Sequence, residues 1–165
     1  MLTTRFTLRK STSHDQAFLA EMLIEAAHAS GHMLTLDDLP DAPDSYRYIA
    51  GWGQPTDLGV IAEDEHGTPV GAAWTRLFDR AVASPAFIDE DTPELTIATT
   101  VTARGHGVGT ALLRRLQDTA ASAGIGALAL GVHRENGPAQ RLYQAQGWTP
   151  HRLAGEYNIL VKHLN

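Results

Sequence analysis

A strand-like run, a glycine-rich hexapeptide and a helix-like run follow one another in the second half of this chain and strongly constrain its fold. The hexapeptide is Arg104-Gly105-His106-Gly107-Val108-Gly109, between a strand-like run at residues 94–101 and a helix-like run at residues 108–123. Glycines let the main chain approach an anion closely, and the N–H groups at a helix start point at it with the positive end of the helix dipole. We therefore expect a strand–turn–helix unit with the geometry of a phosphate site, and we call residues 104–109 the glycine turn.

Strand-like and helix-like segments alternate along the rest of the chain, with no internal repeat and no low-complexity linker. The patterns of apolar and polar residues predict strands at residues 4–9, 57–64, 69–78, 94–101, 127–132, 148–152 and 157–162. They predict helices at residues 14–30, 108–123 and 138–146, and a short one around residues 44–50. This order predicts a mixed α/β fold with one central sheet of about seven strands and about four helices. We expect antiparallel hairpins at both ends and a strand–helix–strand crossover in the middle.

Length and composition exclude several classes of protein. A chain of 165 residues can bury a real core, and we expect a single domain over residues 1–165. The net charge of −6 disfavours nucleic-acid binding, and the lack of cysteine excludes disulfides, thiolate metal sites and a cysteine nucleophile. No apolar run approaches the roughly 20 residues of a membrane helix, and the first six residues lack the apolar core of a signal peptide. We expect a cytoplasmic protein with neither a membrane nor a nucleic-acid partner.

The glycine turn does not fit the two most common nucleotide-binding motifs. In a dinucleotide-binding fold the turn follows the first strand, and an acidic residue about 20 positions later contacts a ribose. Here the turn follows the fourth predicted strand, and the corresponding downstream region is Ala-Gly-Ile-Gly at residues 123–126. A P-loop would need Gly-Lys-Ser/Thr after the turn, which is missing. The phosphate interpretation therefore stands without the dinucleotide and ATP interpretations.

Two segments resemble the signatures of the GNAT acetyltransferase superfamily. The glycine turn looks like the Arg/Gln-x-x-Gly-x-Gly/Ala signature. Residues 136–148 read Asn-Gly-Pro-Ala-Gln-Arg-Leu-Tyr-Gln-Ala-Gln-Gly-Trp and resemble the second signature. That signature has an Asn, an Ala three positions on, a Leu/Phe-Tyr pair, and a Gly-Phe/Trp pair beyond the tyrosine. Both occur in the family's order, about 30 residues apart, and together they imply a GNAT acyl-CoA N-acyltransferase fold.

The resemblance implies an enzyme that moves an acetyl group from acetyl-CoA to a primary amine of a small molecule or a protein or peptide. The glycine turn would hold the pyrophosphate of coenzyme A, and the pantetheine arm would pair with the main chain of the preceding strand. The implied cofactor-binding residues are Ile97, Ala98, Thr99, Val101, Arg104, Gly105, His106, Gly107, Val108, Gly109, Thr110 and Asn136. Asn136 also starts a predicted helix, so a role as N-cap alone stays open.

Tyr143 is the expected general acid, because the family uses a tyrosine at this position to protonate the departing thiolate. A phenol keeps its proton at neutral pH and can donate it; the alternative is a buried aromatic residue that only packs. Glu94 lies near the position of a catalytic glutamate in several family members and is the favoured base, with His133 as its competitor. The alternatives are a solvated strand end for Glu94 and a surface histidine for His133.

The acceptor is not identified by the sequence. In this fold its pocket would be lined by residues near His28, His32, Met33, Tyr46 and Trp52, by the loop after Phe78, and by Glu156 and Tyr157. Trp52, between two glycines, is either an exposed aromatic wall or a core anchor, and the core anchor is favoured. His28 and His32 are spaced like metal ligands, but no third ligand is evident, so we expect no metal.

Two other classes of protein are alternatives to the enzyme. A non-catalytic module that senses acyl-CoA would need the glycine turn and Asn136 but neither Tyr143 nor a base. A pure interaction domain leaves both motifs unexplained. Tyr143 therefore favours the enzyme. Family members are often dimers, so a homodimer is expected from the resemblance alone.

Overall fold

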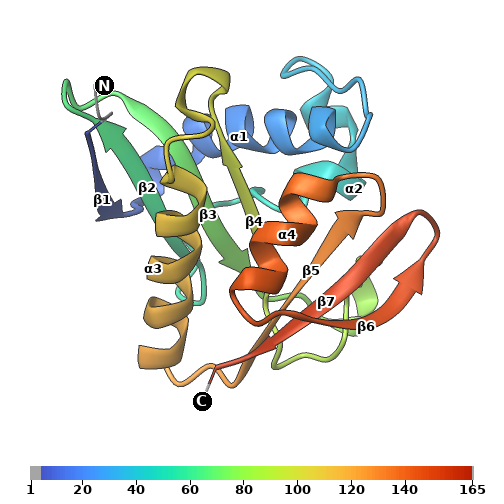
Figure 1. The fold of residues 1–165 in the computed structure, drawn as a ribbon. Coiled ribbons are helices and arrows are strands. Elements are labelled where there is room, and N and C mark those ends of the chain that lie inside the picture. The colour runs from blue at the N-terminus through green and yellow to red at the C-terminus, as the bar shows by residue number, and fades with distance from the viewer. Residues whose placement is uncertain (1–4, 165) are drawn as a thin grey trace.

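A mixed sheet of seven strands in the order β1-β2-β3-β4-β5-β7-β6 forms the centre of the molecule (Figure 1). The computed structural model describes residues 5–164. The strands are β1 (Phe6–Lys10), β2 (Leu58–Asp64), β3 (Pro69–Arg76), β4 (Glu94–Thr99), β5 (Ala127–His133), β6 (Thr149–Ala154) and β7 (Tyr157–His163). The α-helices are α1 (Gln16–Ala29), α2 (Pro43–Tyr46), α3 (Val108–Ser122) and α4 (Gly137–Ala145). The predicted architecture is confirmed; residue Thr4, where the first strand was predicted to begin, lies outside the described residues.

Helices cover both faces of the sheet, with α3 and α4 on the near side in Figure 1 and α1 on the far side. Successive side chains of a strand point to opposite faces. One buried cluster, the α1 cluster, contains Leu19, Met22 and Leu23 of α1, and the other, the α3 cluster, contains the buried leucines of α3. On β2, Ile61 accordingly packs in the α1 cluster, whereas Val60 and Ala62 pack in the α3 cluster. On α3, Leu112, Leu113 and Leu116 are fully buried. Burial of each stabilises the fold by roughly 1.5–3 kcal/mol, so these leucines hold α3 on its face of the sheet.

The sheet splits between its two central parallel strands. β4 and β5 share a single register position, Glu94 with Ala129, and Ala129 N–H donates to Pro93 O at 3.0 Å. Beyond that point β4 continues along β3 and β5 continues along β7. Among the described strands, the β4 edge from residue 96 to residue 99 therefore has no partner on the β5 side. Its alternate N–H and C=O groups are available to a ligand.

The strand before the glycine turn is shorter than predicted. It ends at Thr99, and Val101 begins a 3-10 turn over Val101–Ala103 instead of extending the strand edge. Thr100 N–H still donates to Val70 O at 2.9 Å, but Ala103 N–H then turns back to Thr100 O at 3.1 Å. The 3-10 turn therefore takes the chain out of the sheet before Val101 can pair with a neighbouring strand. The Val101 side chain is 64% exposed.

Trp52 is a core anchor, and the alternative of an exposed aromatic wall is wrong. The residue is buried in the α1 cluster, and its indole N–H donates to Thr12 O at 3.1 Å. The Arg76 guanidinium lies over the ring at 5.6 Å from its centre. Arg76 is itself held by Asp57, at 2.8 Å, with both side chains almost fully buried. Trp52 and this ion pair tie the irregular segment before β2 to the end of β3.

Candidate active site

A cavity of about 1000 Å³ runs through the split between β4 and β5, and we call it the central cavity. Its lining includes five residues that the sequence singled out for catalysis or cofactor binding: Glu94, Ile97, His133, Asn136 and Tyr143. These residues come from β4, the end of β5 and the start and middle of α4. The split thus brings together groups that lie up to about 50 positions apart in sequence.

The cavity connects the two faces of the sheet. Glu94 pairs with Arg76 on β3, and Arg76 lies two residues from Trp74, which packs in the α1 cluster. Because side chains alternate along a strand, Glu94 faces α1, while its neighbour Leu95 packs in the α3 cluster together with Tyr143. Glu94 and Tyr143 therefore approach the cavity from opposite faces.

The remaining predicted cofactor-binding residues lie outside the lining of the central cavity. They are Ala98, Thr99, Val101, Arg104, Gly105, His106, Gly107, Val108, Gly109 and Thr110. Ala98 and Thr99 continue β4 beyond the cavity, and the glycine turn follows at the start of α3. A Cβ placed on Gly109 would lie 3.8 Å from the side chain of Leu142, the neighbour of Tyr143 on α4. The glycine turn therefore lies against the helix that carries Tyr143.

The glycine turn has the features of an anion cradle. Gly105 and Gly107 adopt φ values of 80° and 81°, a region open to glycine, and a Cβ at either position would meet nothing within 4 Å. The first hydrogen bond of α3 runs from Ala111 N–H to Gly107 O at 3.1 Å. The N–H groups of Val108, Gly109 and Thr110 precede it, so they have no intrahelical acceptor. The open space and the donors together fit a pyrophosphate.

The Arg104 side chain forms an ion pair within the chain. Its guanidinium donates to Glu25 on α1 at 3.0 Å, with both side chains partly exposed. This contact ties the glycine turn to the helix on the opposite face of the sheet. A surface ion pair of this kind contributes little stability, and the backbone donors of the turn are untouched by it.

Glu94 is a buried carboxyl group, which contradicts the alternative of a solvated strand end. It is 3% exposed, and burial raises its pKa above the ordinary range. Hydrogen bonds from the Ser84 and Tyr48 hydroxyls, and the charges of Arg47 and Arg152, act in the opposite direction and favour the carboxylate. A carboxylate of raised pKa in a cavity is suited to accept a proton from a bound amine.

Tyr143 is both a packing residue and part of the cavity wall. Its ring is 7% exposed and contacts Trp148 with centroids 5.9 Å apart. Burial raises the pKa of its hydroxyl, so the phenol keeps its proton at neutral pH. Among the described residues, no hydrogen-bond acceptor for this hydroxyl is found within the protein. The hydroxyl can therefore donate to a ligand in the cavity.

His133 already has both ring nitrogens engaged. Glu135 N–H donates to Nδ1 at 3.2 Å, which leaves Nε2 as the donor to Glu156 at 3.2 Å in the neutral ring. The ring also meets Tyr157 edge-on at 5.4 Å between centroids. A histidine whose unprotonated nitrogen accepts a main-chain N–H is poorly placed to act as a base, so the geometry favours Glu94.

Asn136 is the N-cap of α4. Its Oδ1 accepts a hydrogen bond from Ala139 N–H at 3.2 Å, and Pro138 occupies the first turn. The residue also lines the central cavity. The cap uses the side-chain oxygen and leaves the amide N–H groups as possible donors to a ligand.

The predicted acceptor residues divide between the cavity and the rest of the molecule. His32, Met33 and Tyr157 line the cavity, as does the segment 83–86, whereas His28, Tyr46, Trp52 and Glu156 do not. His32 Nε2 and the Tyr157 hydroxyl lie 2.8 Å apart, which joins the loop after α1 to the start of β7. His28 instead contacts Leu34 O at 3.0 Å. The described part of the chain holds no group of three or more His, Asp or Glu residues arranged for a metal ion.

Sequence reasoning missed the residues that surround Glu94 from two loops. Ser84 donates to Glu94 Oε1 from the segment between β3 and β4, and Tyr48 reaches the same carboxylate from the segment after α2. Arg47 and Arg152 hold the β3–β4 segment on either side of Ser84. No local pattern marks these residues, because the contacts join positions 10 to 67 residues apart.

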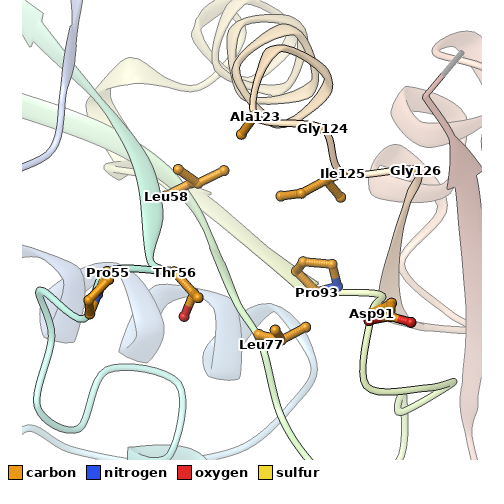
Figure 2. A pocket seen from close by; sticks show the side chains of 10 residues that line it. All are labelled: Pro55, Thr56, Leu58, Leu77, Asp91, Pro93, Ala123, Gly124, Ile125 and Gly126. Atoms are coloured by element: carbon orange, nitrogen blue, oxygen red, sulfur yellow. The ribbon is translucent and has the colours of Figure 1, made fainter.

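A second hollow, of about 440 Å³, lies beside the starts of β4 and β5 (Figure 2). Its lining includes the apolar side chains of Leu58, Leu77, Pro93 and Ile125, together with the carboxyl group of Asp91. None of the predicted catalytic or cofactor-binding residues lines it, and the predicted acceptor region reaches it at Asp91, in the loop after Phe78. We therefore place the candidate site in the central cavity.

No helix within residues 5–164 is long and apolar enough to cross a membrane.

The chain is similar to known acetyltransferases. Residues 19–148 match the model of the acetyltransferase (GNAT) family. The chain is 28% identical over 134 residues to a mycothiol acetyltransferase of Beutenbergia cavernae, a match that covers 81% of this chain and only 40% of that protein. It is 30% identical over 143 residues to a Bacillus subtilis protein that is provisionally named a phosphinothricin acetyltransferase, with 86% and 83% of the two chains covered.

A similar fold is found in a GNAT superfamily phosphinothricin acetyltransferase of Sinorhizobium meliloti, solved in complex with acetyl-CoA. The TM-score is 0.70 at 20% identity, with 99% of this chain and 90% of that chain covered. At that identity the likeness shows the fold.

Proposed function

This chain belongs to the acetyltransferase (GNAT) family, and on that premise we propose that it is an acetyl-CoA-dependent N-acyltransferase. It moves an acetyl group from acetyl-CoA to a primary amine of a small molecule or of a protein or peptide. The observation that carries the proposal is the central cavity, which Glu94 and Tyr143 line from opposite faces of the split sheet. The names of the two curated relatives and the acetyl-CoA complex of the solved one support the reaction and its donor.

The donor is held at two places on this chain. The N–H groups at the start of α3 bind the pyrophosphate, since Gly105 and Gly107 leave the space above them open. The unpaired edge of β4 at Ile97, Ala98 and Thr99 offers main-chain groups to the pantetheine amides. Val101 is excluded from this edge because it lies in the 3-10 turn. Asn136, the N-cap of α4, contributes a side-chain amide N–H to the binding of the donor.

The protons move through Glu94 and Tyr143. When bound, acetyl-CoA supplies the acetyl thioester. Glu94 accepts a proton from the acceptor's ammonium group, which frees the nitrogen lone pair for attack on the thioester carbon. Tyr143 donates its hydroxyl proton to the sulfur as the C–S bond breaks and regains a proton from the new amide nitrogen or from water. The balance is one acetyl group transferred and one proton released to solvent.

The test is an assay for free thiol released from acetyl-CoA, run against polyamines, aminoglycosides, amino acids, phosphinothricin and peptide N-termini. Turnover on any amine supports the proposal and identifies the acceptor class. Calorimetric binding of acetyl-CoA without turnover on any member of the panel would favour the alternative of an acyl-CoA sensor. A pH–rate profile that is the same in Glu94→Gln and wild type would remove Glu94 as the base.

The cytoplasmic location and the homodimer stay predictions from the sequence. Gel filtration with light scattering measures the second directly: a mass of twice the 17.8 kDa of the chain supports it.

A further inference from the structure

The segment that connects β3 to β4, residues 77–93, is fastened at three points around the central cavity. Arg47 donates to Val82 O at 2.9 Å, and Arg152 on β6 donates to Pro85 O at 2.5 Å and to Phe87 O at 3.1 Å. Between these anchors, Ser84 is buried and donates to Glu94 Oε1. Ala86 N–H donates to the Ser84 oxygen at 3.2 Å, which fixes the direction of the serine hydroxyl.

Tyr48 approaches the same carboxylate from another part of the chain. It follows α2 and lines the cavity, and its hydroxyl interacts with both Glu94 and Ser84. Its ring meets Phe78 edge-on at 5.5 Å, and its main-chain oxygen accepts the Trp74 indole N–H at 3.0 Å. The ring is therefore held by packing that does not depend on its hydroxyl.

We propose that Ser84 and Tyr48 are positioning residues for Glu94, whose hydroxyls hold the carboxylate in its ionised form against the cost of burial. The inference rests on the proposed function, in which Glu94 is the base. A buried carboxylate needs donors, because loss of solvation otherwise drives it to the neutral form, which cannot accept a proton. The two hydroxyls provide these donors, and because they are neutral they do not cancel the negative charge of Glu94. That charge therefore stays available to the acceptor amine.

The charged groups around Glu94 support the same reading. Arg47 and Arg152 both favour the carboxylate through their charge, but their guanidinium groups donate to main-chain oxygens of the 77–93 segment and, for Arg47, to Asp44. Arg76, the register partner of Glu94 on β3, is neutralised by Asp57. No guanidinium is paired directly with Glu94 among the described contacts, and the Ser84 and Tyr48 hydroxyls are its side-chain donors.

The experiment measures the pKa of Glu94 without reference to turnover. The protein carries 13C at the δ-carboxyl of glutamate, Glu94→Gln assigns the resonance, and the chemical shift is followed against pH. Ser84→Ala and Tyr48→Phe should each raise the pKa of Glu94 by about one unit or more, since a hydrogen bond to a charged group is that strong. Ser84→Thr, which keeps a hydroxyl, should return it toward the wild-type value. Tyr46→Phe, the same change two residues away and outside the cavity lining, is the matched control and should leave it unchanged.

The two proposals are separated by the pH–rate profile of the same variants. If Glu94 is the base, the acidic limb of kcat/KM moves to higher pH by the same interval as its pKa, because the base must be ionised. A shifted Glu94 pKa with an unmoved rate profile retains the positioning role and removes Glu94 as the base. A Glu94 pKa that is the same in Ser84→Ala, Tyr48→Phe and wild type overturns the inference, whatever the rates do.

Discussion

Replacing Gly107 by alanine tests whether the glycine turn binds the donor, and a matched control lies at the other end of the same helix. Gly107 is the N-cap of α3, with φ of 81°, and Gly124 follows the end of α3, with φ of 83°. A Cβ at either position would meet nothing within 4 Å, so neither substitution causes a clash. The cost of each is conformational, about 1–2 kcal/mol for a non-glycine residue in the left-handed region.

The two variants should be equally destabilised and differ only in donor binding. Alanine restricts the unfolded chain and offsets part of the cost, so we expect a net loss of about 1 kcal/mol, or about 2–4 °C in Tm, for each. Only Gly107→Ala alters the direction of the N–H groups before Ala111 and places a methyl group in the open cradle. The loss of one charge-assisted hydrogen bond weakens binding by about tenfold or more.

The assay is isothermal titration calorimetry with coenzyme A, paired with differential scanning calorimetry of the free proteins. We expect Gly124→Ala to bind coenzyme A as the wild type does and Gly107→Ala to bind it at least tenfold more weakly. Equal affinities in the two variants, at equal stability, would refute the assignment of the pyrophosphate to the glycine turn.

Three further substitutions test other parts of the structure. Glu94→Gln should stabilise the fold at pH 8 but not at pH 4 in urea denaturation. Burial raises the pKa of Glu94 in the folded state. The stability that Glu94 contributes is therefore present in full below its pKa in the unfolded chain and is lost as the pH rises through its pKa in the folded protein. A stability difference between Glu94→Gln and wild type that does not change with pH would contradict this expectation. Asp57→Asn should lower the free energy of unfolding by about 3–5 kcal/mol, because it leaves the buried Arg76 without its counter-charge, and a loss below 1 kcal/mol would show that the pair is not buried in solution. Tyr157→Phe removes the 2.8 Å contact with His32 on the acceptor side of the cavity, so the KM for the amine should change while the KM for acetyl-CoA does not; the opposite pattern would place the contact on the donor side.

Local sequence patterns predicted the parts of the site whose geometry is local. The glycine turn needs two positive-φ residues at a helix start, and Gly105 and Gly107 supply them whatever the rest of the fold does. The N-cap at Asn136 and the helix after it follow from the same kind of pattern. The hairpins at both ends and the strand–helix–strand crossover in the middle were also predictable, because short connections leave few alternatives.

Patterns failed where tertiary contacts decide the outcome. Val101 reads as the end of a strand, but Thr100 N–H makes the last bond to β3 and a 3-10 turn follows. Glu94 was favoured as the base, but its burial was not predicted, because Tyr48 and Ser84, which surround it from two loops, carry no local signal. The loop after Phe78 was expected to line the acceptor pocket, but the contacts that fasten it were not predicted, because the arginines that make them lie 35 and 67 positions from their acceptors.

The central claim is that the split of the sheet joins Glu94 and Tyr143 in one transfer site, and Tyr143→Phe tests it most directly. The substitution keeps the ring that packs on Trp148 and removes only the proton donor. With an active amine in the thiol-release assay, kcat should fall by about 100-fold, the lower range for a general acid. The KM for acetyl-CoA and the Tm should stay near their wild-type values. A wild-type kcat in Tyr143→Phe would show that the hydroxyl in the cavity takes no part in the reaction and would contradict the account.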